Sequence, residues 1–316
     1  MNILNNIKPN LVVIFDECHN INANTSLFIP PDIPFVIGLS ATPQRQYDEI
    51  GTTKITEVVG EQCYEYALHQ AIGKSLTRYM YYPHLTLLNQ DESLEYEKIT
   101  IKIVRAAKRG NEEELSRLLI LRRRILDNCE SKIQYWLSQI KETNWEPYTL
   151  IYTSDKIKTQ HEAVCNYLYD HNVDFSQLTF EETSQPRIVN RILSSFRDKS
   201  IKVLCAKRVL DEGFDIPEIS TAYILASTTV HRQWIQRMGR LLRKSKKLPN
   251  KVAKIHDYIV LPNPEFQSGS STRQIIKAEL TRCHIFSQHS ENAWLAGGGL
   301  ALVSELASQY SVSIDA

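Results

Sequence analysis

The sequence predicts an α/β protein whose second half folds around a parallel, doubly wound sheet. From residue 149 onward, short apolar segments alternate with amphipathic segments of helical period, as is typical of parallel strands joined by crossover helices. Two apolar runs near the N-terminus end in polar or small residues, as buried strands do where they open into a binding crevice. Between these regions, a stretch without proline carries an apolar residue every three or four positions, which predicts helix.

The individual elements follow from the same patterns. The N-terminal strands are predicted at 11–15 and 34–39, and the helical stretch covers 92–142. In the second half the predicted strands are 149–154, 175–180, 201–206, 222–227 and 255–261. The predicted helices between them are 156–171, 185–197 and 231–242. A loop is expected at 263–272, followed by a final helical region from about Arg273. In such a sheet, function is expected at the carboxyl ends of the strands.

Composition sets bounds on the protein class. The 316 residues suffice for two domains with their own cores, and 42% hydrophobic residues are ordinary for a soluble globular protein. With 37 Lys and Arg against 36 Asp and Glu, net charge argues neither for nor against a polyanionic partner. The six cysteines form no C-x-x-C pair, which favours reduced thiols over disulfides or a zinc site. No membrane span or signal peptide is evident, so we expect a cytoplasmic protein.

Two adjacent acids follow the first predicted strand, in the sequence "DECH" at residues 16–19. Hydrolysis of a nucleoside triphosphate requires one carboxylate near Mg²⁺ and a second group that orients the attacking water. Asp16 and Glu17 are placed to divide these tasks between them. Taken alone, the pattern is equally compatible with two solvated acids in a loop between a strand and a helix.

Three further motifs follow in order along the chain. "SAT" at residues 40–42 ends the second predicted strand, and "LDEGFDIP" at 210–217 lies between two later strands. "QWIQRMGRLLR" at 233–243 contains glutamine, glycine and two arginines in the order Q-x-x-G-R-x-x-R. An arginine presents a planar, permanently charged fork that matches phosphoryl oxygens. The alternative for Arg240 and Arg243 is a solvated basic helix face.

Together these residues resemble the superfamily-2 helicases and nucleic-acid translocases. Residues 16–19 resemble motif II, 40–42 motif III, 210–217 motif V and 236–243 motif VI. The spelling "DECH", the form "VLDEGFDIP" and the helix "LLILRRRIL" are similar to the branch of restriction-enzyme translocases and the helicase of transcription-coupled repair. The resemblance implies a partial N-terminal RecA-like domain (1–84), a helical connector (85–145), a complete C-terminal RecA-like domain (146–262) and a C-terminal helical extension (263–316).

The resemblance also implies a role for each matching residue, with ATP and Mg²⁺ as cofactors. Asp16 would hold Mg²⁺ through water and Glu17 would polarise the attacking water. His19 and Gln236 would face each other across the cleft between the domains, and Ser40 and Thr42 would relay domain closure. Gly213 and Asp215 would lie near the nucleotide's sugar and the cleft lining. Arg240 and Arg243 would reach its phosphates, with Arg243 as the arginine finger.

The phosphate-binding loop of such an enzyme is expected ahead of motif II, and only fifteen residues precede Asp16. The "GKS" at residues 73–75 does not fit, because Leu68 stands where the loop requires its first glycine, and no strand is predicted to lead into it. We therefore expect residues 1–316 to resemble the C-terminal portion of a longer helicase. A truncated gene, a split gene and an internal start all remain open.

Basic residues supply the candidates for nucleic-acid contact. Lys207 stands where many relatives have a threonine that touches the nucleic-acid backbone, and Arg208 keeps that place cationic. Nine Lys or Arg residues and no acid lie between 231 and 254, and they could serve DNA or form a solvated loop. For the arginines at 122–124, pairing with nearby acids or solvent is favoured over nucleic acid. The aromatic "YMYYP" at 79–83 is interpreted as packing at the domain junction.

The preferred interpretation is the C-terminal portion of an ATP-dependent DNA translocase or helicase that acts on nucleic acid, with duplex DNA as the expected track. The main alternative is a nucleic-acid-binding or regulatory module without catalysis. A third possibility is complementation, in which a separate polypeptide supplies the missing N-terminal half.

Overall fold

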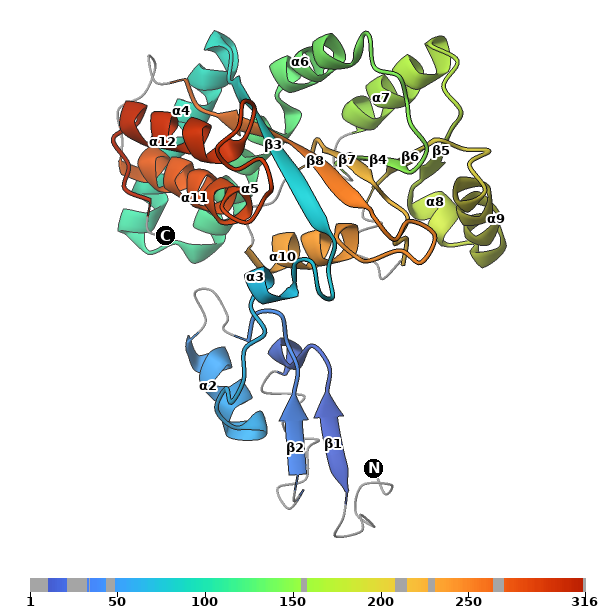
Figure 1. The fold of residues 1–316 in the computed structure, drawn as a ribbon. Helices are drawn as coiled ribbons and strands as arrows, with labels where there is room; N and C mark the ends of the chain where they lie inside the picture. The colour runs from blue at the N-terminus through green and yellow to red at the C-terminus, as the bar shows by residue number, and fades with distance from the viewer. Residues whose placement is uncertain are drawn as a thin grey trace. The chain divides into compact units, whose positions relative to one another are not determined.

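The computed structural model describes residues 11–21, 33, 35–43, 49–154, 158–207, 215–226, 231–263 and 270–314. The chain divides into two compact units, residues 1–70 and residues 71–316 (Figure 1). None of the described helices is long and apolar enough to cross a membrane.

The first unit contains a short parallel sheet. Strands β1 (Val12–Phe15) and β2 (Phe35–Gly38) pair in parallel, and helix α2 (Glu49–Val59) packs against them. Gly38 allows this packing, because a Cβ there would lie 2.8 Å from Cγ2 of Val59. The 3-10 turn η2 (Cys18–Asn20) follows β1, and the short helix α3 (Leu68–Ala71) lies at the boundary of the units. Both predicted N-terminal strands are therefore present.

The second unit is built on a six-stranded sheet in the order β3-β8-β7-β4-β6-β5. All its strand pairs are parallel, which confirms the predicted mixed α/β class with a parallel sheet. The strands are β3 (Arg78–Leu87), β4 (Thr149–Tyr152), β5 (Phe175–Leu178), β6 (Val203–Ala206), β7 (Thr221–Ile224) and β8 (Val252–Leu261).

Strand β3 departs from the sequence interpretation, which placed residues 79–83 at a domain junction and ended the first domain at 84. β3 pairs with β8 along its whole length and belongs to the second unit, whose boundary lies at Ala71. Pro83 lies within β3 although proline has no N–H for the ladder. The edge position of β3 explains its tolerance there, since an edge strand leaves one row of N–H groups outside the ladder.

Helices cover this sheet. The stretch expected to be a helical connector forms α4 (Gln90–Arg109), α5 (Glu112–Asn128) and α6 (Glu130–Ile140). Asn89 begins α4 with a capping box to Glu92. The other helices are α7 (Lys158–Asp170), α8 (Phe180–Thr183), α9 (Pro186–Arg197), α10 (His231–Leu241), α11 (Ser270–Ser287) and α12 (Gly299–Gln309). In Figure 1, α11 and α12 lie beside α4 and α5 at the β3 end of the sheet, and α8 and α9 lie at the β5 end.

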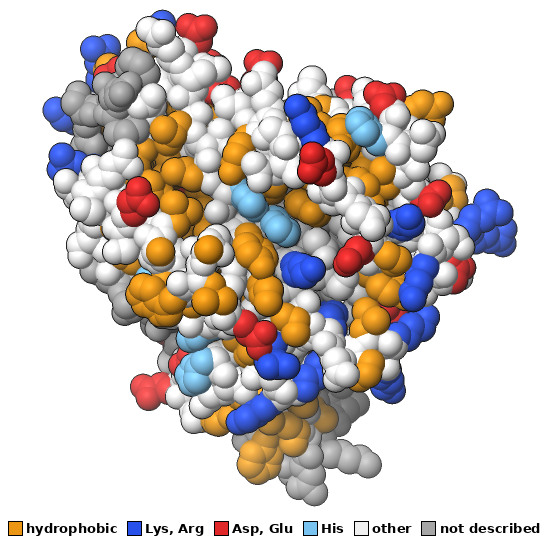
Figure 2. Space-filling model, turned by 45° about the horizontal axis from the view of Figure 1, so that its top comes forward, with side chains coloured by type: hydrophobic (Ala, Val, Ile, Leu, Met, Phe, Trp, Pro, Cys, Tyr) orange, Lys and Arg blue, Asp and Glu red, His pale blue; other side chains and the backbone are white. Residues whose placement is uncertain are grey.

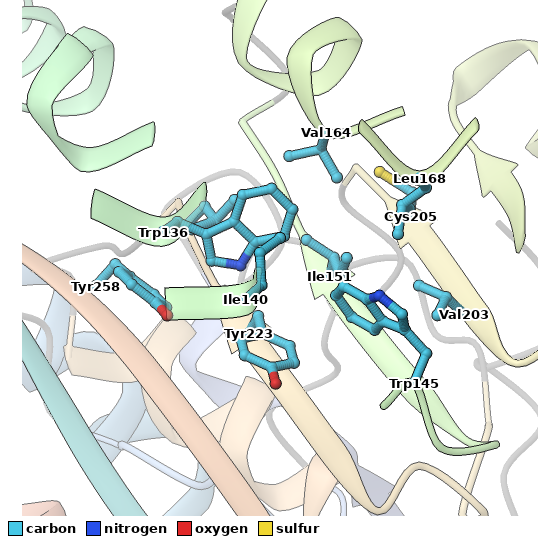
Figure 3. Packing of buried hydrophobic residues seen from close by; sticks show 11 residues of the cluster. Trp136, Ile140, Trp145, Ile151, Val164, Leu168, Val203, Cys205, Tyr223 and Tyr258 are labelled. Carbon is cyan, nitrogen blue, oxygen red and sulfur yellow. The ribbon is translucent and has the colours of Figure 1, made fainter. Parts of the chain in front are cut away.

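Large aromatic and aliphatic side chains fill the core. Trp136 of α6 is fully buried and packs with Ile151 of β4 and Leu168 of α7 (Figure 3). A second cluster joins α11 and α12 to β8, with Leu261, Leu280 and Leu306 among its buried members. The helical connector and the C-terminal extension thus share cores with the sheet rather than standing apart from it.

A network of buried charges links the sheet to the helices around β3. Arg282 of α11 donates to Asp257 of β8 at 2.6 Å and to Glu279 at 2.7 Å, and all three side chains are buried. Glu279 also accepts from Arg123 of α5 at 2.9 Å, and Tyr81 of β3 donates to Asp257 at 2.7 Å. Burial alone would raise the pKa of Glu279, but Arg282 and Arg123 outweigh it and lower that pKa to about 2.

A stack of imidazole and phenol rings crosses β3, β8 and β7. His256 stacks on Tyr82 and Tyr223, and its Nδ1 lies 3.0 Å from Nε2 of His84. Burial lowers the pKa of His84 to about 4, although Asp257 opposes the shift. Burial and the neighbouring His84 lower the pKa of His256 to about 3. Both rings are therefore neutral in the folded protein at neutral pH.

We predict that acid destabilises the second unit through these histidines. The unfolded chain takes up their protons near pH 6.5, whereas the folded chain does so only near pH 4 and pH 3, so the free energy of unfolding falls as the pH drops below 6.5. His256→Phe keeps the ring stack and should make urea unfolding less dependent on pH between 4 and 6.5. The exposed His171→Gln serves as the control; equal pH slopes for both variants would contradict this prediction.

Candidate nucleotide site

The acids of "DECH" lie in the turn that follows β1. The Leu39 N–H donates to the Phe15 carbonyl and the Cys18 N–H donates to the Leu39 carbonyl, each at 2.9 Å, so this turn is held against the end of β2. Glu17 has φ 52° and ψ 48°, the left-handed region that non-glycine residues rarely adopt. Asp16 is exposed. The backbone thus presents two neighbouring carboxylates at the carboxyl end of a parallel strand.

The histidine of the same motif connects it to "SAT". Nδ1 of the buried His19 lies 2.9 Å from Oγ of Ser40 and 3.2 Å from Oε2 of Glu17. The Thr42 N–H donates to the same Ser40 hydroxyl oxygen at 3.1 Å. The structure therefore brings Glu17, His19, Ser40 and Thr42 together within the first unit.

Helix α10 carries the motif VI residues of the second unit. Its buried face consists of Trp234, Arg237, Met238 and Leu241. Gln236 and Arg240, four positions apart, share the half-exposed face, and Arg243 follows the end of the helix. α10 is thus anchored on one face and presents Gln236 and Arg240 on the other, and the alternative of a solvated basic face for Arg240 and Arg243 stays open.

A salt bridge joins motif V to motif VI. Arg243 donates to Asp215 at 2.5 Å, and both side chains are partly exposed. Arg197 of α9 donates to the Asp215 carbonyl at 3.2 Å. Asp215 therefore sets the direction of the Arg243 guanidinium while leaving part of it open to solvent.

Three buried cations that the sequence did not single out hold α10 and its ends in place. Trp234 packs edge-on against Phe286 and beneath the Arg282 guanidinium, at 4.6 Å from its ring centroid. Arg237 lies over the Tyr152 ring at 4.6 Å and donates to the Ala226 carbonyl at 3.2 Å. Lys251, the third, lies at the start of β8.

The Lys251 ammonium links the end of motif V to the end of motif VI. Its Nζ lies within hydrogen-bond distance of four main-chain carbonyls, at 2.8 Å from Pro217, 3.1 Å from Ile219, 3.2 Å from Leu241 and 2.6 Å from Arg243. Two of these belong to the segment after Asp215 and two to the end of α10. Burial lowers the pKa of Lys251 to about 8, although Glu218 opposes the shift.

The basic residues at 231–254 therefore fall into a buried group and an exposed group. Arg237 and Lys251 are buried, whereas Lys244, Lys246 and Lys247 are exposed. On the face drawn in Figure 2, Lys and Arg side chains are interspersed with acidic ones and form no continuous basic field. Among the arginines at 122–124, Arg122 is buried over the Tyr96 ring and Arg123 pairs with Glu279 and Asp127. The prediction that arginines of this run pair with acids is confirmed for Arg123.

The remaining predicted residues lie elsewhere. Lys207 follows β6, and its N–H donates to the Leu178 carbonyl at 3.0 Å. Arg208 and Gly213 lie outside the described residues. The "GKS" at 73–75 forms a turn between α3 and β3, in which the Gly73 N–H donates to the Leu76 carbonyl at 2.8 Å. Because a helical turn precedes it and a strand follows it, this segment lacks the strand–loop–helix context of a phosphate loop.

Comparison with known proteins bears on the second unit. Residues 131–245, which run from the first turn of α6 past the end of α10, match the family model described as the helicase conserved C-terminal domain. This part of the chain is thus similar to helicase C-terminal domains. Over 262 residues it is 26% identical to a protein named DNA 3'-5' translocase XPB2 from Sulfurisphaera tokodaii, covering 75% of this chain. The chain spans 56% of the length of that relative.

Solved structures of helicase domains also align with the chain. A fragment of a putative HsdR subunit of a type I restriction enzyme from Vibrio vulnificus aligns with a TM-score of 0.49 and 17% identity, over 78% of this chain and 43% of the other. The Hef helicase domain from Pyrococcus furiosus aligns with a TM-score of 0.46 and 14% identity, over 84% of this chain and 72% of the other.

Replacement of Lys251 should destabilise the second unit. Lys251→Met leaves four carbonyls without the ammonium, and we expect the free energy of unfolding to fall by about 3 kcal/mol, the scale for a buried group deprived of its partner. Urea denaturation measures the change. Lys254→Met, at an exposed position of the same strand, is the control, and an equal effect of the two substitutions would refute the structural role.

Proposed function

We propose that this chain is a portion of an ATP-dependent DNA translocase or helicase, in which the motif II acids and the motif VI arginines each act on ATP and Mg²⁺. The observation that carries the proposal is the arrangement on α10. Gln236 and Arg240 share its half-exposed face, and Asp215 orients the Arg243 guanidinium. Within a chain that is similar to helicase C-terminal domains, this arrangement favours binding of a triphosphate over a structural use of the arginines.

The proposed roles divide between the two units. Asp16 holds Mg²⁺ through water, and Glu17, beside it, polarises the water that attacks the γ-phosphate. His19 and Ser40 are hydrogen-bonded to each other, and the Thr42 N–H donates to Ser40. These three residues respond together to the state of the nucleotide.

In the second unit, Gln236 and Arg240 contact the nucleotide. Arg243 stabilises the charge that develops on the phosphoryl group. The salt bridge to Asp215 holds the Arg243 guanidinium in one position before ATP binds. When ATP binds, the guanidinium exchanges the Asp215 carboxylate for the phosphates of the nucleotide.

The first unit supports the proposal that a phosphate loop comes from a segment outside residues 1–316. In the parallel pairing of β1 with β2, Val12 lies opposite Phe35 and Ile14 lies opposite Ile37. These four side chains therefore lie on one face of the β1–β2 sheet. All four are exposed, Ile14 by 60% and Phe35 by 59%. An exposed apolar sheet face beside open strand edges fits a docking surface for further strands. We propose that its occupant is the strand–loop–helix segment that carries the phosphate-binding lysine.

Duplex DNA is the proposed track, with Lys207 and Arg208 as backbone contacts. Support comes from the relative named as a DNA translocase and from the position of Lys207 at the carboxyl end of β6, where parallel sheets bind ligands. Because a lysine contacts phosphate as a point charge, binding through it is expected to weaken as salt is raised.

ATP turnover by the purified chain, with and without duplex DNA, tests the proposal. We expect little turnover by residues 1–316 alone and DNA-stimulated turnover when a segment carrying the phosphate loop is supplied. In that reconstituted protein, Arg243→Ala should reduce kcat by about 10³-fold, the lower end of the effect of an arginine finger. The exposed Lys246→Ala is the matched control and should leave kcat nearly unchanged.

Two outcomes would contradict this function. Strong DNA-stimulated turnover by residues 1–316 alone would refute the need for an external phosphate loop. Salt-sensitive DNA binding without turnover, even after the segment is supplied, would favour a nucleic-acid-binding module instead.

A further inference from the structure

A cluster of one histidine and two cysteines lies apart from the nucleotide site. His161 and Cys165 are four positions apart on α7 and so share one helix face, and that face meets Cys205 of β6. One ligand atom from each residue lies within 4.8 Å of the other two. His161 and Cys205 are buried and Cys165 is partly buried.

The histidine is oriented as a metal ligand would be. Its Nδ1 faces the cluster, at 3.5 Å from the Cys205 sulfur. A zinc ion with bonds of about 2.3 Å to sulfur and about 2.0 Å to nitrogen, at a tetrahedral angle, separates its ligand atoms by about this distance. The other ring nitrogen, Nε2, lies 3.4 Å from Oε1 of Gln177. Such an outer hydrogen bond fixes the tautomer of a ligating histidine and leaves Nδ1 free to bind a metal.

The sulfur atoms are suited to the same task. Cys165 and Cys205 supply two sulfur ligands of the kind that zinc binds as thiolates. Metal binding would release their thiol protons to solvent. Thr153 places its hydroxyl 2.8 Å from Nδ1 of His161, where its oxygen or a water can complete four ligands.

We propose that His161, Cys165 and Cys205 form a binding site for a thiophilic divalent cation of the zinc class, with Thr153 at the fourth position and Gln177 as the outer partner of the histidine. The site joins α7 to β6, two residues before Lys207. It does not rest on the proposed helicase function. The sequence analysis favoured reduced thiols over a zinc site, because the cysteines form no C-x-x-C pair and the two cysteine ligands lie forty residues apart.

Cobalt titration of the full chain under reducing conditions tests the site. We expect one equivalent of Co²⁺ to produce a thiolate-to-cobalt charge-transfer band and the intense visible bands of a tetrahedral centre, both removed by one equivalent of Zn²⁺. Zn²⁺ should also raise the Tm. Cys165→Ser, at the partly buried position, should weaken binding by more than about tenfold, and Gln177→Leu by about tenfold.

Cys129→Ser is the matched control, since Cys129 is a buried cysteine outside the cluster, and it should bind cobalt as the parent does. Far-UV circular dichroism confirms that each variant is folded. Absence of the charge-transfer band in the parent, or an unchanged band in Cys165→Ser, would overturn the proposal. A disulfide between Cys165 and Cys205 in the oxidised chain, with no metal uptake by the reduced chain, would overturn it as well.

Discussion

The second unit depends on a single buried guanidinium, that of Arg282. It lies between Asp257 of β8 and Glu279 of its own helix, with the Trp234 ring of α10 against its face. Burying three charges is costly unless each finds its partner in good geometry. The strand and both helices must therefore take up their positions together. Arg123 extends the same constraint to α5 through Glu279.

This constraint accounts for the position of the candidate site. α10 presents Gln236 and Arg240 outward because Trp234 and Arg237 fix its inner face on buried neighbours. Lys251 then ties the end of the helix to the segment that follows Asp215. A site held in this way would need little rearrangement of the second unit to bind the proposed triphosphate, which is the arrangement that electrostatic catalysis favours.

The sequence predicted the fold best where a single pattern of apolar and polar residues is compatible with only one kind of secondary-structure element. The strands that alternate with helices after residue 149 were all predicted, because short apolar runs bounded by polar residues have few alternatives. β3 was missed because residues 79–83 were interpreted as aromatic packing at a domain junction, and only the sheet order reveals that they pair with β8 at an edge.

For the site, the motifs singled out His19, Ser40, Asp215 and Arg243, but the contacts of His19 with Ser40 and of Asp215 with Arg243 are known only from the structure. The roles of Arg237, Lys251 and Arg282 could not be predicted. Their partners are main-chain carbonyls, aromatic faces and acids brought close only by the tertiary fold.

Hydrogen exchange in the Arg282→Met variant tests most directly whether this guanidinium positions α10. The substitution leaves Asp257 and Glu279 without Arg282, and we expect a loss of about 3–5 kcal/mol in the free energy of unfolding, together with faster exchange of the amides of α10. Arg78→Met removes an arginine from the exposed pair with Glu291 and provides the reference. If α10 exchanges equally slowly in both variants and their stabilities are equal, the account of the second unit is wrong.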